Sequence, residues 1–300
     1  MVIRNFDELI RKVWNFDKKR KVAVVVAEDQ HTLEAVFKAK EDNILDPILI
    51  GNKDRIKKIL DTKNYSLEDE SIIDVEDEVA AAYKGVELVK MNRADFIMKG
   101  KIQTADLLKA VVHKEKGIRT GNLMSHFAIL EVPTYHKLLV ITDGGMVMYP
   151  DKEEKKQIIE NAVGILTALG YEKPKVGILS AVEKVNPKMQ ETVDADELKQ
   201  MNEKGQIKDC VIEGPISYDL AMNRQSAEIK GFNSPVAGDV DILITPNMTS
   251  GNVLAKSLIY SGNSKMAGLI VGAQVPIVLT SRGASTEEKY LSLVLSAAAV

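Results

Sequence analysis

The residues best suited to chemistry lie near the carboxyl end, where an apolar run stops at Ser281-Arg282-Gly283 and a helical pattern then begins. A hydroxyl and a guanidinium thus meet the amino terminus of the predicted helix, and the carboxylate of Glu288 follows. Such a terminus favours anions, because its first backbone N–H groups have no partner inside the helix and its peptide dipoles add to a partial positive charge. The pattern predicts a seat for a phosphate or a developing oxyanion.

Ser285 and Glu288 also have the spacing of a capping box, in which the serine caps the helix and the glutamate reaches back to the cap. This structural interpretation would hold Glu288 beside the Ser281-Arg282 turn. Because a capping glutamate can still accept a proton, the catalytic and the structural interpretations are compatible, and both stay open.

Two other polar segments follow predicted strands. Lys99-Gly100-Lys101 pairs two cations with a glycine, as a phosphate-binding turn does, although it lacks the full spacing of a P-loop and a solvated basic loop is the alternative. Thr249-Ser250-Gly251-Asn252 combines hydroxyls with a glycine at a helix start. Helix capping explains part of the second segment and leaves Asn252 unexplained.

Several common chemistries lack support in the sequence. The four histidines, at positions 31, 113, 126 and 136, include no pair four residues apart around a glutamate, so no zinc site is predicted. Cys210 is the only cysteine, which excludes an intramolecular disulfide, and its position at the start of a predicted strand indicates a buried small residue. No G-x-G-x-x-G motif follows a strand, so the usual sequence signature of a nicotinamide-binding site is absent.

Composition sets the class of protein. The chain has 300 residues, of which 45% are hydrophobic and 28% charged, as in soluble globular proteins. A net charge of -3 provides no global basic field for nucleic acid or an anionic membrane. The longest apolar run, Ala267 to Leu279, is too short and too interrupted to span a bilayer, so no membrane role is indicated. A single cysteine suits a reducing cytosol, so a cytoplasmic protein is expected.

The elements that must position these residues alternate between strand and helix, which predicts an α/β fold with mostly parallel sheets. Strands are expected at Lys21–Ala27, Ala94–Met98, Leu138–Thr142, Lys175–Ser180, Cys210–Gly214, Asp241–Pro246 and Pro276–Thr280. Helices are expected to start at Thr104, Ser217 and Ser250, and long loops at 143–151 and 181–196. Since ligands bind at the carboxyl ends of parallel strands, the polar clusters after these strands should converge.

Ser281-Arg282-Gly283-Ala284-Ser285, with residues 249–252 and the segment from Met98 to Lys109, resembles the phosphate acetyl/butyryltransferases, most closely their butyryl branch. The likeness covers essentially the whole chain. It implies two α/β/α domains like those of the isocitrate and isopropylmalate dehydrogenases, with the active site in the cleft between them. The first domain would comprise residues 1–137 and 275–300, and the second, residues 138–274, would form a homodimer or a higher homo-oligomer.

The resemblance implies reversible transfer of a short acyl group between coenzyme A and phosphate, with both as substrates and no tightly bound cofactor or metal. Ser281 and Arg282 would stabilise the oxyanion and Glu288 would act as the general base. The implied substrate-binding residues are Lys99, Gly100, Lys109, Thr249, Asn252 and Gly283.

The chain departs from the acetyl branch at three positions. Ala284 stands in place of a cysteine, Glu288 in place of an aspartate, and Lys109 in place of an arginine, which turns a bidentate phosphate contact into a point charge. Four alternatives stay open: a phosphate acetyltransferase, a decarboxylating dehydrogenase on the same fold, an acyl-phosphate transferase to another acceptor on that fold, and a non-catalytic acyl-CoA-binding protein.

Overall fold

The computed structural model describes residues 2–281 and 283–300, which form two compact units. We call residues 7–122 and 267–300 the terminal unit, and the residues up to 6 with 123–266 the central unit. The units thus change near residues 123 and 267, whereas the sequence placed the crossings near 138 and 274. The first difference arises because the strand Ser125–Glu131 pairs with the strand Leu139–Thr142 and so belongs to the same unit. The interdomain active site and the dimer surface stay predictions.

The strands of the terminal unit follow the order β3-β2-β1-β4-β11-β10. All neighbours pair in parallel except β10 and β11, which are antiparallel. Its strands are β1 (Arg20–Val25), β2 (Leu45–Gly51), β3 (Ile72–Asp74), β4 (Phe96–Lys99), β11 (Ile277–Val278) and, from residue 267 on, β10 (Lys265–Val271). Its helices are α1 (Phe6–Trp14), α2 (Gln30–Glu41), α3 (Lys53–Lys63), the short 3-10 turn Asp69–Ser71, α4 (Glu78–Lys90), α5 (Thr104–Val112) and α11 (Thr286–Ala299).

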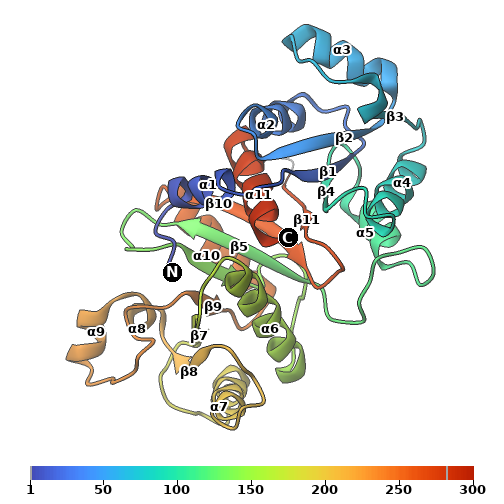
Figure 1. Cartoon of the computed structure of the whole chain (residues 1–300). Coiled ribbons are helices and arrows are strands. Elements are labelled where there is room, and N and C mark those ends of the chain that lie inside the picture. The colour runs from blue at the N-terminus through green and yellow to red at the C-terminus, as the bar shows by residue number, and fades with distance from the viewer. Residues whose placement is uncertain (1, 282) are drawn as a thin grey trace. The chain divides into compact units, whose positions relative to one another are not determined.

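Burial on both faces explains why these strands read as continuous apolar runs. The last four residues of β1 and the first three of β4 are all buried, as expected for parallel strands covered by helices. α11 is buried from Lys289 to Ala298 and packs beside α2, although the two helices come from opposite ends of the chain (Figure 1). This packing carries the beginning of α11 to the beginning of α2.

The strands of the central unit follow the order β5-β6-β9-β7-β8, in which only β5 and β6 pair antiparallel. Its strands are β5 (Ser125–Glu131), β6 (Leu139–Thr142), β7 (Lys175–Leu179), β8 (Val211–Ile216) and β9 (Ile242–Ile244). Its helices are α6 (Lys152–Ala168), α7 (Gln190–Glu203), α8 (Tyr218–Met222), α9 (Arg224–Ile229) and α10 (Met248–Tyr260).

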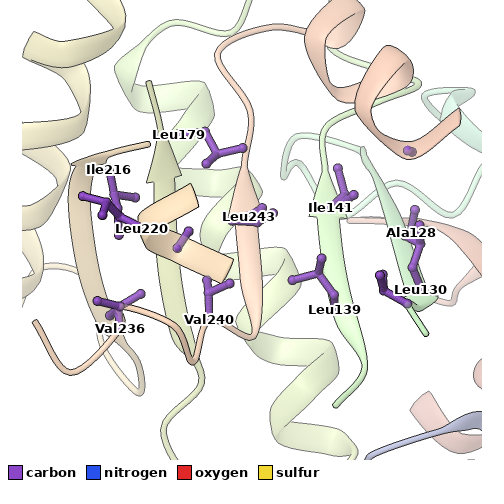
Figure 2. Close-up of a cluster of buried hydrophobic side chains, with 14 of the residues drawn as sticks. Ala128, Leu130, Leu139, Ile141, Leu179, Ile216, Leu220, Val236, Val240 and Leu243 are labelled. Atoms are coloured by element: carbon purple, nitrogen blue, oxygen red, sulfur yellow. The ribbon is translucent and has the colours of Figure 1, made fainter. Parts of the chain in front are cut away.

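One hydrophobic cluster covers a face of this sheet, as Figure 2 shows. Leu139 and Ile141 stand two residues apart on β6 and so point to the same face, where Leu220 of α8 packs with them in the same cluster. The alternation of strand residues therefore decides which side chains α8 and its neighbours cover.

The predicted α/β class with mostly parallel pairing is confirmed, and each of the seven predicted strands corresponds to a strand of the structure. Three local expectations need correction. β1 ends at Val25, because Val26 has a left-handed φ of 54°. α10 begins at Met248 with Asn247 as its cap, so Ser250 lies inside the first turn. α7 begins at Gln190, inside the predicted loop 181–196.

Candidate active site

A cavity of about 430 Å³ lies in the terminal unit where β4 and β11 end. These strands pair in parallel, with Val278 opposite Met98, so the segments that follow them leave the sheet side by side. Lys99, Gly100 and Ser281, which the sequence selected from distant segments, all line this cavity. Further lining residues include Asp29, Thr32, Lys101, Gln103 and Lys289.

Gly100 allows the turn after β4 to lie directly against the end of β1. Its backbone N–H donates to the Val25 carbonyl, and the Lys101 N–H donates to the Val26 carbonyl, both at 2.8 Å. A Cβ on Gly100 would lie 2.1 Å from the Val26 oxygen, so a side chain there would force the backbone to shift. Val26 itself adopts a left-handed φ of 54°, which is rare for a β-branched residue and costs energy. Strain of this kind concentrates at ligand-binding sites.

The same turn places positive charge around the cavity. Lys99 is partly buried, with its Nζ 3.3 Å from the Gly100 carbonyl oxygen, and Lys101 is exposed. α5 begins beside them, and its N-cap Gln103 makes no side-chain capping bond. Ammonium groups next to a helix amino terminus favour an anion. Lys99 and Gly100 both line a defined cavity, and their roles in substrate binding stay predictions.

Two charged residues of the cavity had no role in the sequence interpretation. Lys289 of α11 is buried, and its Nζ lies 3.2 Å from Asp29 Oδ2. The backbone N–H and the hydroxyl of Thr32 both donate to the same oxygen, which caps α2. Burial raises the pKa of Asp29, but the hydrogen bonds from Thr32 and the Lys289 ammonium outweigh it and hold that pKa below its ordinary value. The sequence does contain a signal for this pair: a lysine in the first turn of a predicted helix, where the helix dipole disfavours positive charge.

The start of α11 confirms one half of the predicted capping box. Ser285 is the N-cap, and its hydroxyl oxygen accepts from the Glu288 backbone N–H at 3.1 Å. Glu288 is partly buried and Gly283 is exposed with open space around it. Arg282 lies outside the described residues. The catalytic roles assigned to Ser281, Arg282 and Glu288 stay predictions.

Lys109 has a different environment from Lys99. It lies in the last turn of α5, its side chain is 76% exposed, and its Nζ pairs with Asp106 at 3.0 Å. It is not among the residues that line the cavity. A phosphate contact from Lys109 would therefore need its long side chain to leave Asp106, and this assignment also stays a prediction.

Thr249 and Asn252 belong to the first turns of α10 in the central unit, and both are exposed. The side-chain amide of Asn252 donates to the Gly144 carbonyl at 3.1 Å. Gly251 packs so closely on the turn after β6 that a Cβ there would lie 2.6 Å from the Asp143 oxygen. Asn252 thus has a structural contact that the sequence left unexplained, and substrate binding by Thr249 and Asn252 stays a prediction.

Asp143 organises that turn. Its Oδ1 accepts from the backbone N–H groups of Gly145 and Met146, both at 2.7 Å, and its Oδ2 accepts from the His126 N–H at 2.8 Å. The His126 ring packs on Gly145, and its Nδ1 is buried without a hydrogen-bond partner in the described part of the chain. Burial lowers the pKa of His126, and the negative charge of Asp143, which raises it, does not cancel this effect. Since histidine ordinarily has a pKa of about 6.5, the ring is neutral at pH 7.

Residues 2–281 and 283–300 contain no low-pKa cysteine, no cluster of metal-ligating side chains and no membrane-spanning helix. Burial raises the pKa of the Cys210 thiol to about 12, which leaves it protonated and a poor nucleophile at neutral pH. No group of three or more His, Cys, Asp or Glu side chains in these ranges is arranged to hold a metal ion. Nor is any helix within them long and apolar enough to cross a membrane.

Comparison with known proteins agrees with the resemblance seen in the sequence. The family model described as phosphate acetyl/butaryl transferase matches residues 75–297. A phosphate butyryltransferase of Clostridium acetobutylicum is 44% identical, over 99% of this chain and 98% of that protein. A phosphate acetyltransferase of Thermotoga maritima is 40% identical, over 93% of this chain and 95% of that protein.

A solved structure supports the same relationship. The branched-chain phosphotransacylase from Enterococcus faecalis V583 superposes with a TM-score of 0.80 at 33% identity, covering 92% of this chain and 97% of that one. Because the family match covers most of the chain and the relatives match over nearly their full lengths, the chain belongs to the phosphate acetyl/butaryl transferase family.

Proposed function

We propose that this enzyme catalyses the reversible reaction butanoyl-CoA + phosphate = CoA + butanoyl phosphate. Relatives named phosphate butyryltransferase support the reaction over the full length of the chain. The observation that supports a particular site for this reaction is the cavity lined by Ser281, Lys99 and Gly100 at the ends of parallel strands. That cavity offers a hydroxyl, an ammonium group and a close backbone turn to a phosphate.

In the direction that forms the thioester, the CoA sulfur attacks the carbonyl carbon of the acyl phosphate. A free thiol has a pKa near 8.5 and is mostly protonated at pH 7, a deficit of about 2 kcal/mol that a general base removes. Glu288 takes the thiol proton, while Ser281 and Arg282 donate to the developing oxyanion. The new C–S bond forms, the C–O bond to phosphate breaks, and phosphate leaves with the electron pair. Both substrates are bound together, so proximity supplies much of the acceleration and no covalent enzyme intermediate is needed.

The acetyl group is the second candidate for the transferred acyl chain. The 40% identical relative from Thermotoga maritima is named phosphate acetyltransferase, and it matches nearly as much of this chain as the butyryl relative does. The two activities share the same chemistry at the carbonyl and differ in the length of the acyl chain that is transferred.

A thiol-release assay tests the proposal. Purified enzyme is mixed with butyryl-CoA, acetyl-CoA or a branched acyl-CoA, and free thiol is measured with and without inorganic phosphate. We expect phosphate-dependent thiol release, fastest with butyryl-CoA. Tight CoA binding without any phosphate-dependent release would instead identify a non-catalytic acyl-CoA-binding protein.

We also propose that the enzyme works in the cytoplasm as a homodimer or a higher homo-oligomer, assembled through residues 138–274, without a tightly bound cofactor. Light scattering on the purified protein measures the assembly. Activity that survives dialysis against a metal chelator would support the absence of a required metal.

A further inference from the structure

Lys289 is a buried cation at a position that is unfavourable for positive charge. It lies in the first turn of α11, where the helix dipole repels a cation, and its side chain is only 9% exposed. Burying an ammonium group costs free energy unless negative charge compensates for it. An apolar residue would fill this place on α11 without that cost, since the residues that follow it are buried as well.

Asp29 supplies part of the compensation. Its Oδ2 lies 3.2 Å from Lys289 Nζ, but that oxygen also accepts two hydrogen bonds from Thr32. An ammonium group has three donors, and Asp29 is the acceptor that Lys289 contacts among the described residues. Lys289 therefore lines the cavity with donor capacity to spare, held in place by a carboxylate that the α2 terminus fixes.

The surroundings favour a second anion. Three helices begin at this cavity: Asp29 and Thr32 mark the start of α2, Gln103 that of α5, and Lys289 that of α11. Lys99 and Lys101 add positive charge, and the carboxylates of Asp29 and Glu78 offset part of it. Each helix amino terminus favours negative charge. An anion bound among these termini would therefore compensate for the positive charge of Lys289.

We infer that Lys289 is a further substrate-binding residue, and that its ammonium group binds the phosphate of the reaction while Asp29 positions it. The inference rests on the proposed function. CoA also carries phosphate groups, but these lie a whole pantetheine arm away from the reacting thiol. Ser281, which is proposed to act at the reacting carbonyl, lines the same cavity as Lys289, so the phosphate beside Lys289 is the inorganic or acyl phosphate.

Calorimetric titration with inorganic phosphate and, separately, with CoA tests this assignment without requiring turnover. For Lys289→Met we expect the Kd for phosphate to rise about ten- to a hundredfold, the effect of losing a charged hydrogen bond, with the Kd for CoA within about threefold of wild type. Lys289→Arg keeps the charge and should retain most of the phosphate affinity. Lys38→Met is the matched control, because Lys38 forms an exposed ion pair with Asp42 on α2.

Removing one partner of a buried ion pair often destabilises the fold, so a second variant covers that outcome. Asp29→Asn/Lys289→Met leaves no unpaired charge and should also lose phosphate affinity. Phosphate binding within about threefold of wild type in a folded Lys289→Met or double variant, or a loss of CoA affinity instead, overturns the assignment. If wild type binds phosphate through Lys289 but releases no thiol from acyl-CoA, the proposed function fails and the binding site stands.

Discussion

At the scale of single residues, Gly100 shows how tightly the backbone defines the candidate site. For Gly100→Ala we expect at least about 2 kcal/mol lower unfolding free energy and a large loss of thiol release, because the new Cβ would meet the Val26 oxygen at 2.1 Å. Thermal unfolding and the assay measure both effects. Gly164→Ala is the control: this exposed glycine of α6 has open space around it, so alanine should stabilise the helix by about 0.5–1 kcal/mol. Equal behaviour of the two variants would contradict the argument.

Arg282 and Glu288 are predicted to contribute unequally to turnover. Losing an oxyanion donor typically costs about 3 to 4 kcal/mol of transition-state stabilisation, whereas replacing the base forfeits only the deprotonation of a thiol that is already partly ionised. We therefore expect Arg282→Ala to lower kcat more than Glu288→Gln, measured by thiol release. A folded Arg282→Ala enzyme with nearly full activity would show that the assignment is wrong.

Residue types and spacing predicted the cavity in part. Lys99 and Ser281 were selected because each follows an apolar strand, and β4 and β11 do end side by side. The pair of Asp29 and Lys289 was not predicted. Its two members lie far apart in the sequence, and only the packing of α11 against α2 brings them together.

At the scale of elements, a buried ion pair joins α6 to α7. Lys155 Nζ lies 2.6 Å from Asp194 Oδ2, and both side chains are less than 10% exposed. We expect Lys155→Met alone to lower the unfolding free energy by about 3 to 5 kcal/mol, because it leaves Asp194 charged and buried. Lys155→Met/Asp194→Leu removes both charges and should recover most of that loss. Chemical denaturation measures both variants, and additive effects in the double variant would contradict this account.

Of the eleven strands among the described residues, seven were predicted from their apolar runs, whereas β2, β3, β5 and β10 were not predicted. β2 was missed because Asp46 and Pro47 argue against a strand, yet its pairing with β1 carries it through them. The start of α10 was misplaced because Ser250 and Asn247 are both good capping residues. The backbone settles the choice by using Asn247 as the cap and Ser250 as its partner in the capping box.

At the scale of the whole molecule, we expect stability in acid to depend on His126. Burial lowers its pKa in the folded protein below the value of about 6.5 that it has when unfolded. Its contribution to stability is therefore complete above about pH 6.5 and is lost as the pH falls below that value, since the unfolded state then binds the proton more readily.

Calorimetric unfolding of the wild type and of His126→Gln, from pH 7.5 to pH 5.5, tests this dependence. We expect the unfolding temperature of the wild type to fall more steeply on acidification than that of the variant, whose side chain does not titrate. Parallel pH profiles would show that other groups govern acid stability.

The sequence by itself determined the α/β class, the order of most strands along the chain and the residues that follow them, because hydrophobic periodicity and turn chemistry are local properties. It also determined the family, since Ser281-Arg282-Gly283 and its companion segments are contiguous motifs. Only the tertiary structure decided that β11 lies beside β4, that α11 packs on α2, and that Lys289 meets Asp29 at the cavity. These contacts join residues that are far apart in the chain, and long-range strand pairing and helix packing, which no local pattern encodes, bring them together.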